Sequence, residues 1–217
     1  MVYYISNETK VAGKEVINLD MIPGDGDRKK IKVIDLTPDG GLYVEEERAL
    51  CSGRAVETEF FPKRLKKCSG SVMPDYGYLY RLNYVSDRFR RIVEAVEPGV
   101  HQFIPFQIVG PKKAVLADMF FMNICNRLDS VDREHTTLLL AHGAIWAPGR
   151  EVPREQWPRD FDPDVAGRFV FNNSQVGDHH LWFDKHSGDG PYLSDTLAGA
   201  LLQGNITGVK LQKAESV

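Results

Sequence analysis

Hydrophobic and polar positions follow the same combined pattern twice along the chain, at residues 84–108 and again at residues 192–213. Each copy has a short apolar segment, a Ser-Asp pair, an amphipathic stretch, a Gly and a second apolar segment. The pairs are Ser86-Asp87 and Ser194-Asp195, and the glycines are Gly99 and Gly208. Ser and Gly are 13 positions apart in the first copy and 14 in the second. Because Ser and Gly mark helix starts and stops, the pattern predicts a duplicated strand–helix–strand unit.

The amphipathic stretches predict one helix per copy. In the first copy the apolar positions recur at i, i+3, i+4 and i+7, at Phe89, Ile92, Val93 and Val96. In the second copy the apolar face consists of Leu197, Leu201 and Leu202. This spacing gives one hydrophobic face of a helix. Ser86 and Ser194 are good N-cap residues, and the following Asp favours the positive end of the helix dipole.

Several apolar runs predict strands. Residues 114–124 form the most apolar stretch and predict a central buried strand, with a bulge at Asp118. Residues 100–109 predict a second strand, in which Pro105 indicates an edge position or a bulge. Two further strands are expected at residues 168–171 and 180–183, joined through residues 172–178.

The first part of the chain is rich in turns. An apolar alternation at residues 31–36, the turn cluster 37–41 and residues 42–44 predict a hairpin. The polar stretch 69–77 suggests a boundary between a β-rich lobe, residues 1–74, and an α+β lobe, residues 75–217. The two lobes also fit one continuous domain. The expected fold class is α+β, with a mixed or mainly antiparallel sheet and a few short helices.

Composition limits the function classes. The 217 residues carry a net charge of −3, which argues against a direct nucleic-acid binder. Residues 151–217 hold 6 basic and 10 acidic groups, which suits a basic partner surface but equally a solvated acidic face. Three cysteines without close pairing suit a reducing compartment, and no apolar run approaches membrane-spanning length. We therefore expect a cytoplasmic protein that binds no membrane.

The His/Asp-rich segment 178–189 is the best candidate for metal chemistry. It contains Asp178, His179, His180, Asp184 and His186. Adjacent residues of a strand point to opposite faces, so His179 and His180 do not readily share one ion. We expect no metal and no cofactor, and keep a metal-dependent enzyme using this segment as the alternative function.

Other candidate sites also have simple structural explanations. Cys125 ends an apolar strand, where a buried thiol is inert rather than nucleophilic. The Gly-Asp clusters at 24–27 and 188–190 match no phosphate or calcium motif and predict turns. Residues 126–129 predict a polar cluster that fixes the strand end. Within it, Arg127 and Asp129 could pair with each other or with Asp87 and Arg88.

Five segments in this order resemble a known bacterial family. They are Ser86-Asp87-Arg88-Phe89, Gln102-Phe103-Ile104-Pro105, Asn126-Arg127-Leu128-Asp129, His180-Leu181-Trp182, and the closing element from Ser194-Asp195 to Thr207-Gly208-Val209. Together they resemble immunity protein family 11 of polymorphic toxin systems, first catalogued as a domain of unknown function. The resemblance covers residues 75–217 closely and residues 1–74 only in general character.

The resemblance implies a cytoplasmic, non-enzymatic protein that binds and neutralises a cognate toxin delivered between bacteria, for example by type VI secretion. Nucleases are one toxin class in such systems. The family has no catalytic residues to transfer onto this chain, and the sequence leaves self-association open.

A Pro-, Trp- and charge-rich insertion, residues 146–164, is the expected toxin-binding loop. Its candidate contact residues are Arg154, Trp157, Arg159, Asp160, Phe161, Asp162 and Asp164. Aromatic and Arg anchors among charges are typical of binding hot spots. The competing interpretation is that Trp157 and Phe161 point inward and pack on their own domain.

Overall fold

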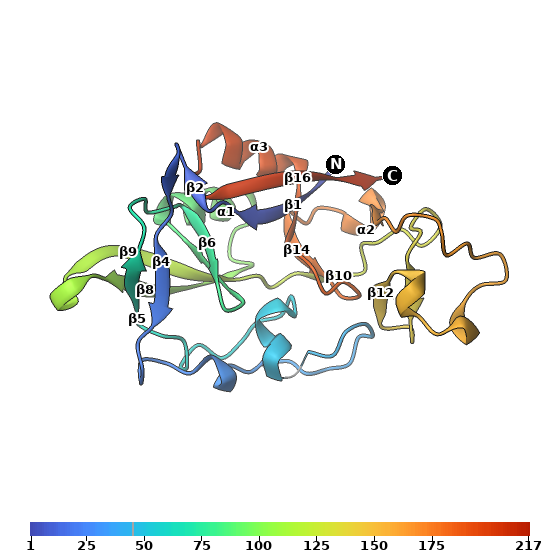
Figure 1. The fold of residues 1–217 in the computed structure, drawn as a ribbon, viewed down its shortest axis with the longest axis horizontal. Helices are drawn as coiled ribbons and strands as arrows, with labels where there is room; N and C mark the ends of the chain where they lie inside the picture. The colour runs from blue at the N-terminus through green and yellow to red at the C-terminus, as the bar shows by residue number, and fades with distance from the viewer. Residues whose placement is uncertain (45) are drawn as a thin grey trace.

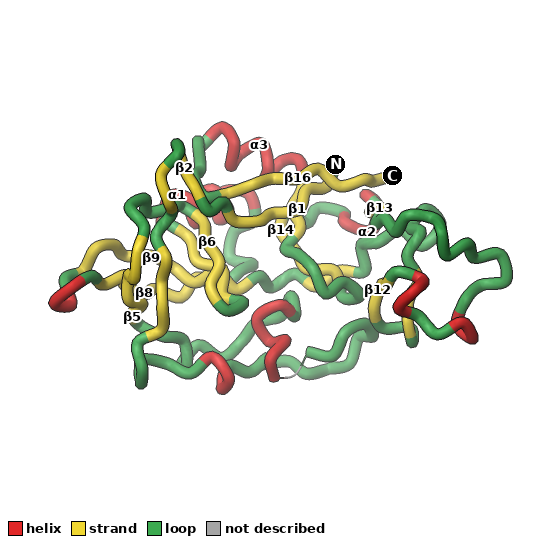
Figure 2. Tube along the Cα trace, in the orientation of Figure 1, coloured by secondary structure: helices red, strands yellow, loops and turns green. Residues whose placement is uncertain are grey.

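Two six-stranded sheets form the framework of the protein (Figures 1 and 2). The computed structural model describes residues 1–44 and 46–217. The first sheet contains, in spatial order, β10 (Arg127–Leu128), β14 (Leu181–Asp184), β15 (Tyr192–Ser194), β1 (Val2–Asn7), β16 (Val209–Ser216) and β13 (Val170–Phe171). The second contains β4 (Asn18–Met21), β5 (Arg64–Ser69), β8 (Gln102–Val109), β9 (Val115–Asn123), β7 (Leu82–Val85) and β6 (Tyr76–Leu79).

Short elements complete the fold. Two small hairpins are β2 (Lys10–Val11) with β3 (Lys14–Glu15), and β11 (Leu139–Ala141) with β12 (Ile145–Ala147). The α-helices are α1 (Asp87–Val96), α2 (Asn173–Val176) and α3 (Asp195–Gln203). Short 3₁₀ helices are η1 (Arg28–Lys30), η2 (Glu46–Cys51), η3 (Pro111–Lys113), η4 (Gly149–Glu151) and η5 (Arg154–Gln156). No helix in the described part of the chain is long and apolar enough to span a membrane.

Most neighbouring strands run antiparallel. Among the described strands, the parallel pairs are β10 with β14, β13 with β16 and β5 with β8. The predicted α+β class with a mixed, mainly antiparallel sheet is therefore confirmed.

The repeated sequence pattern folds as two units of the same topology. In the first unit, β7 and β8 are joined by α1 and lie on either side of β9, antiparallel to it. In the second, β15 and β16 are joined by α3 and lie on either side of β1, again antiparallel to it. The duplication is confirmed. The two central strands differ in their place along the chain: β9 follows the unit to which it pairs, whereas β1 precedes its unit.

Both predicted helix caps are present and have matching geometry. The backbone φ and ψ are −73° and 164° at Ser86, and −73° and 163° at Ser194. The Ser86 Oγ accepts from the Phe89 amide at 3.2 Å, and the Ser194 Oγ accepts from the Leu197 amide at 3.3 Å. Each cap thus satisfies one otherwise unpaired donor of the first helical turn.

The caps differ in their second partner. The Ser86 hydroxyl donates to the Asp75 carboxylate at 2.7 Å, whereas Ser194 Oγ lies 2.7 Å from Nδ1 of His180. Asp75 also accepts from Arg88 and from Thr207, so it joins the two units at their helix ends.

Helices α1 and α3 bury their apolar faces in one core that both sheets share. Phe89, Val93, Leu197 and Leu201 are at most 2% exposed. They pack with strand residues of both sheets, which are Ile5, Tyr76, Val85, Met122, Leu181, Phe183 and Leu193. Strands before and after residue 74 lie in the same two sheets and contribute to this core. The division into lobes at residue 74 stays a prediction.

The apolar run at residues 114–124 is a central strand, as predicted, because β9 lies between β8 and β7. Its second half is buried on both faces. Phe121 packs in a core formed with residues 16–65, and Met122 packs in the core under the helices. A strand covered on both faces loses the alternation of a half-exposed strand. The irregularity of this strand lies at Leu116 and not at the predicted Asp118, because Ile108 pairs with Ala117 whereas Val109 pairs with Val115.

Pro105 lies in β8, a strand that is internal in the sheet. At this residue β8 pairs with β9 on one edge but is not yet paired with β5 on the other. The Gln107 amide donates to Lys63 at the start of the β5 pairing, at 2.9 Å. Amides two residues apart point to the same edge of a strand. The missing N–H of Pro105 therefore faces the side where β5 has not yet begun, which explains why proline fits there.

The predicted hairpin at residues 31–44 is wrong. Residues 31–36 do not pair with residues 42–44, since the Ile34 amide donates to Ala55 and Val33 forms a bridge with Val56. The strands expected at residues 168–171 and 180–183 form at residues 170–171 and 181–184, where β13 pairs with β16 and β14 pairs with β15.

The polar segment 126–129 fixes a strand end as predicted, but its side-chain partners differ from those expected. Arg127 pairs with Asp39 at 2.9 Å and donates to the carbonyls of Ser52, Gly40 and Leu42. Its side chain is only 6% exposed, so it holds the irregular segment around residue 40 against β10. Asp129 instead pairs with Arg133 and Lys185.

Candidate functional site

The predicted binding loop, residues 146–164, lies at one end of the molecule: its first two residues belong to β12, and the rest lies within the segment 148–168. Residues 148–168 extend beyond the first sheet, at the right of Figure 1, and carry η4 and η5. A small apolar cluster of Leu139, Ala141, Ala147 and Val152 lies beneath them. The loop is thus attached to the β11–β12 hairpin rather than to the two main cores.

Trp157 and Phe161 point inward and form the base of this loop. Their ring centroids are 5.2 Å apart in an edge-on arrangement, and both rings pack on the small cluster. The Trp157 indole N–H donates to the Val152 carbonyl at 2.9 Å. The Phe161 ring lies so close to Gly149 that a Cβ there would have no room. The competing interpretation made from the sequence therefore describes these two side chains.

The charged candidates of the loop face outward. Arg154 lies over the Trp157 ring, 5.6 Å from its centroid. Arg159, Asp160 and Asp164 are exposed and form no ion pair within the described residues. Asp162 accepts from the Asp164 amide at 2.9 Å, which fixes the turn. The loop thus presents mixed charge on a rigid aromatic base.

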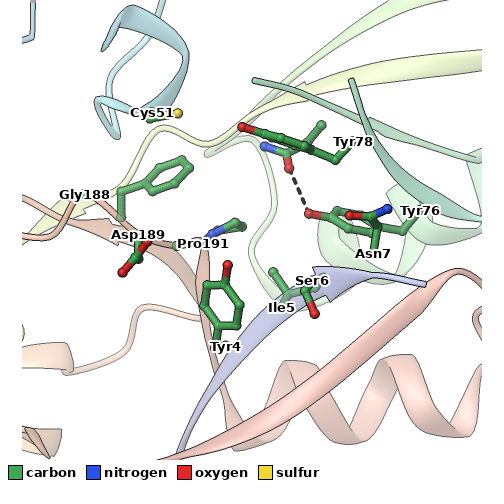
Figure 3. A pocket seen from close by; sticks show the side chains of 13 residues that line it. Tyr4, Ile5, Ser6, Asn7, Cys51, Tyr76, Tyr78, Gly188, Asp189 and Pro191 are labelled. Carbon is green, nitrogen blue, oxygen red and sulfur yellow. Dashed lines mark hydrogen bonds between the residues drawn. The ribbon is translucent and has the colours of Figure 1, made fainter. Parts of the chain in front are cut away.

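A pocket of about 250 Å³ opens between the two sheets (Figure 3). One wall is β1, with Tyr4 and Asn7, and the opposite wall is β6, with Tyr76 and Tyr78. The loop at residues 188–191 closes a third side. This pocket could not be predicted from the sequence, because its walls come from three distant parts of the chain.

Hydrogen bonds fix the framework of the pocket. The Tyr76 hydroxyl donates to Asn83 Oδ1 at 2.8 Å, and the hydroxyls of Ser187 and Tyr192 lie 2.9 Å apart. Burial raises the pKa of Tyr76 strongly, so this phenol remains neutral. Gly190 has φ +132° and packs against Phe183, so the loop requires glycine there.

Glu97 is a buried carboxylate with hydrogen-bond donors on both oxygens, and its role could not be predicted from the sequence. Oε1 accepts from Asn126 Nδ2 at 2.7 Å and from the His180 amide at 3.3 Å. Oε2 accepts from His101 Nε2 at 3.0 Å and from the Leu181 amide at 3.1 Å. Burial raises the pKa of Glu97, but the hydrogen bond from His101 and the other donors outweigh it and lower the pKa.

The residues of the segment 178–189 do not converge on one centre. His180 contacts Ser194, Asp184 accepts from the amide and hydroxyl of Ser130, and His186 contacts the Ala144 carbonyl. His179 is half exposed, with Nδ1 3.6 Å from Glu97. Among the described residues, no group of three or more His, Cys, Asp or Glu side chains is placed to hold a metal ion.

Cys125 has a histidine nearby but no base for its thiol. Nδ1 of His101 accepts from the Cys125 backbone amide at 3.2 Å, so its lone pair is occupied. Burial raises the pKa of the Cys125 thiol, the reverse of what an activated nucleophile needs.

The clusters at 24–27 and 188–190 form turns, as predicted from the sequence. Asp25 accepts from the Lys63 amide at 2.7 Å and pairs with Arg64 at 2.8 Å. Its carboxylate is thus used to tie the turn to β5.

No curated protein matches the chain, but residues 38–216 match the immunity protein family Imm11.

The chain belongs to the Imm11 immunity family. The match begins at residue 38, well before the residue 75 at which the resemblance seen in the sequence becomes close. It therefore includes the segment at residues 39–42 that Arg127 holds, and most of the core formed with residues 16–65.

The loop at residues 148–168 and the pocket between the sheets are both open at the surface of this Imm11 protein. The Glu97 network and the two serine caps lie inside the fold and serve its architecture.

Proposed function

We propose that this Imm11 protein binds a cognate antibacterial toxin and neutralises it by stoichiometric association in the cytoplasm of the cell that makes both. The single observation that carries the proposal is the family match over residues 38–216. The proposal includes delivery of the toxin between bacteria, by type VI secretion or a comparable route. It also includes a non-enzymatic mechanism, in which the chain blocks its target without turning it over.

The loop at residues 148–168 is the toxin contact in this proposal. Its outward side chains are Arg154, Arg159, Asp160, Asp162 and Asp164. The Trp157–Phe161 base holds the backbone in place, which reduces the entropy lost on binding. Stable inhibitory interfaces bury about 1,600 Å² in total, so the loop would contribute one part of a larger surface.

The charge of the C-terminal third supports a basic target surface. Residues 151–217 carry 6 basic and 10 acidic groups. Complementary charge speeds association and excludes wrong partners. A nuclease presents basic groups to its substrate, so a nuclease toxin fits this charge.

Co-expression with the toxin encoded beside this chain tests the proposal. We expect the chain to restore growth to cells that produce the toxin, and a catalytically inactive toxin to co-purify with it. Growth arrest that persists while the chain accumulates in folded form would contradict the proposal.

A further inference from the structure

The pocket between the sheets differs from a small-molecule site in size. Its volume is about 250 Å³, whereas sites for drug-sized ligands span about 300–1,000 Å³. It opens at the surface between β1, β6 and the loop at residues 188–191. This space suits one inserted side chain rather than a whole metabolite.

Three tyrosines, Tyr4, Tyr76 and Tyr78, line this space. The hydroxyl of Tyr76 is occupied, because it donates to Asn83 Oδ1. The hydroxyls of Tyr4 and Tyr78 form no hydrogen bond within the described residues. Figure 3 shows Tyr4 rising from β1 beside Asp189 and Pro191, with Tyr78 reaching over from β6 on the other side. Two phenols thus offer both an aromatic surface and an open polar group.

Asp189 provides the charge of the pocket. Of the described residues that line it, Asp189 alone is a carboxylate, and none is a Lys or Arg. Asp189 is exposed and has no ion pair within the described residues, while its amide donates to Ser187 Oγ at 3.1 Å. Burial, and then the negative charge of Asp189, raise the pKa of Tyr4. Figure 3 shows Asp189 and the Tyr4 ring at the same end of the pocket.

The fixed positive charges near the pocket lie on its Tyr78 side. Arg48, Arg81 and Arg127 line a neighbouring hollow, which shares Cys51, Tyr78 and Gly188 with the pocket. The thiol of Cys51 is neutral, because burial raises its pKa. At the Tyr4 end an incoming cation meets the Asp189 carboxylate and the Tyr4 phenol oxygen, and none of the described lining residues is a Lys or Arg.

We propose that this pocket receives an arginine side chain of the bound toxin, with the guanidinium against Asp189 and Tyr4. A guanidinium is planar, stacks on aromatic rings and pairs with a carboxylate through two hydrogen bonds. Lysine lacks the planar stacking and the forked donors, so arginine fits better. This inference rests on the proposed function for the identity of the partner. The fit of a guanidinium to the pocket does not depend on the proposed function.

A titration with small arginine analogues tests the pocket separately from the toxin. The probes are N-acetyl-arginine methylamide, its neutral citrulline counterpart and N-acetyl-glutamate methylamide, followed by NMR chemical shifts of labelled protein. We expect shifts at residues 4–7, 76–78 and 188–191 with the arginine probe alone, saturating in the millimolar range. Equal shifts with citrulline, shifts with the glutamate probe instead, or no shifts up to about 50 mM probe, well above the expected millimolar range, would overturn the proposal.

Three variants make the test specific. Asp189→Asn should weaken the arginine probe about fivefold, and Tyr4→Phe, which keeps the ring, about twofold to fivefold. Asp118→Asn is the matched control, since Asp118 is an exposed carboxylate on the β8–β9 hairpin outside the pocket. It should leave the affinity unchanged. An equal loss in the control would overturn the assignment to Asp189.

The toxin itself distinguishes failure of this inference from failure of the proposed function. Asp189→Asn should weaken toxin binding at least about tenfold, since a charge pair in an interface is desolvated. Unchanged toxin affinity in Asp189→Asn would overturn the inference and leave the proposed function intact. A wild-type chain that binds the arginine probe but not the toxin would overturn the proposed function and the toxin part of this inference together.

Discussion

Glu97 shows at the scale of one residue how the fold uses a buried charge. It ends α1, where the helix dipole disfavours a carboxylate. Four donors from residues 101, 126, 180 and 181 offset that cost. The sequence predicts the helix end from Pro98 but cannot predict the role of Glu97. Its partners are spread over more than eighty residues and meet only in the folded state.

Glu97→Gln should change both stability and its pH dependence. The folded-state pKa of Glu97 is lowered, so its stabilising contribution is present above the unfolded pKa of about 4.5 and is lost as the pH falls below it. The substitution should cost about 2 kcal/mol at pH 7, because an amide nitrogen replaces one accepting oxygen. It should also flatten the loss of stability between about pH 5 and 3.

Urea unfolding at several pH values measures both effects. Glu94→Gln, on the same helix and without a hydrogen bond in the described structure, is the matched control. If the two variants lose stability equally at pH 7, the network does not act as described.

The two serine caps give a prediction that depends on their different second partners. Alanine at either position should cost about 1 kcal/mol through the lost cap. Aspartate is also a good N-cap, but at position 86 it would meet the Asp75 carboxylate, whereas at position 194 it would meet His180. Ser86→Asp should therefore be at least about 1 kcal/mol less stable than Ser194→Asp at pH 6–7. Thermal unfolding of the four variants measures this, and equal stability of the two aspartate variants would count against the assigned contacts.

At the scale of elements, the sequence reveals the repeated unit but not its third strand. The Ser-to-Gly spacing and the apolar face predict each helix with its flanking strands, because these signals are local. The apolar run of β9 predicts a central strand, but β1 could not be assigned to its unit in this way, since its pairing with β16 joins residues about 200 positions apart. The expected hairpin at residues 31–44 was also wrong because the true partner is not the next local segment. Ile31 and Val33 are buried in the core beside residues 55–57, whereas Ile34 and Leu36 are exposed.

The shared core predicts that the chain unfolds in one transition. Both helices pack on both sheets, so loss of one unit exposes the apolar face of the other. Tryptophan fluorescence and far-UV circular dichroism should give coincident urea curves. Two separate transitions would instead support independent lobes on either side of residue 74.

Phe89→Ala should lower the stability of the whole molecule. Phe89 is fully buried and stacks on Tyr76 of β6, with ring centroids 5.7 Å apart. Removing a buried phenylalanine costs about 3–5 kcal/mol, and the single transition should move without splitting. Leu202→Ala on α3, where the side chain is 66% exposed, is the control and should change stability little. A variant in which only one half of the structure is lost would contradict the shared core.

At the scale of the whole molecule, the family could be recognised from the order of local motifs, whereas the binding surface could not. The candidate loop was identified from composition alone. The structure shows that its aromatic residues serve as a base and only its charges face outward. The pocket between the sheets gave no signal in the sequence, because Tyr4, Tyr78 and Asp189 lie far apart along the chain.

Charge reversal tests the proposed role of the loop. Replacing Asp160, Asp162 and Asp164 with Lys should slow toxin association about tenfold at low salt and reduce its salt dependence, while the fold stays intact. Replacing Glu57, Glu59 and Asp118 with Lys makes the same change of charge on exposed residues away from the loop. Stopped-flow association at several salt concentrations compares the two. If both variants behave alike, net charge and not this loop governs association.

The most direct measurement is a titration of toxin activity with the purified chain. A stoichiometric inhibitor should abolish activity at a sharp end point of one chain per toxin, and the end point should not move with incubation time. Toxin recovered from the complex after denaturation and refolding should be active again. An end point far below one chain per toxin that falls further with time would show catalytic inactivation and contradict the account.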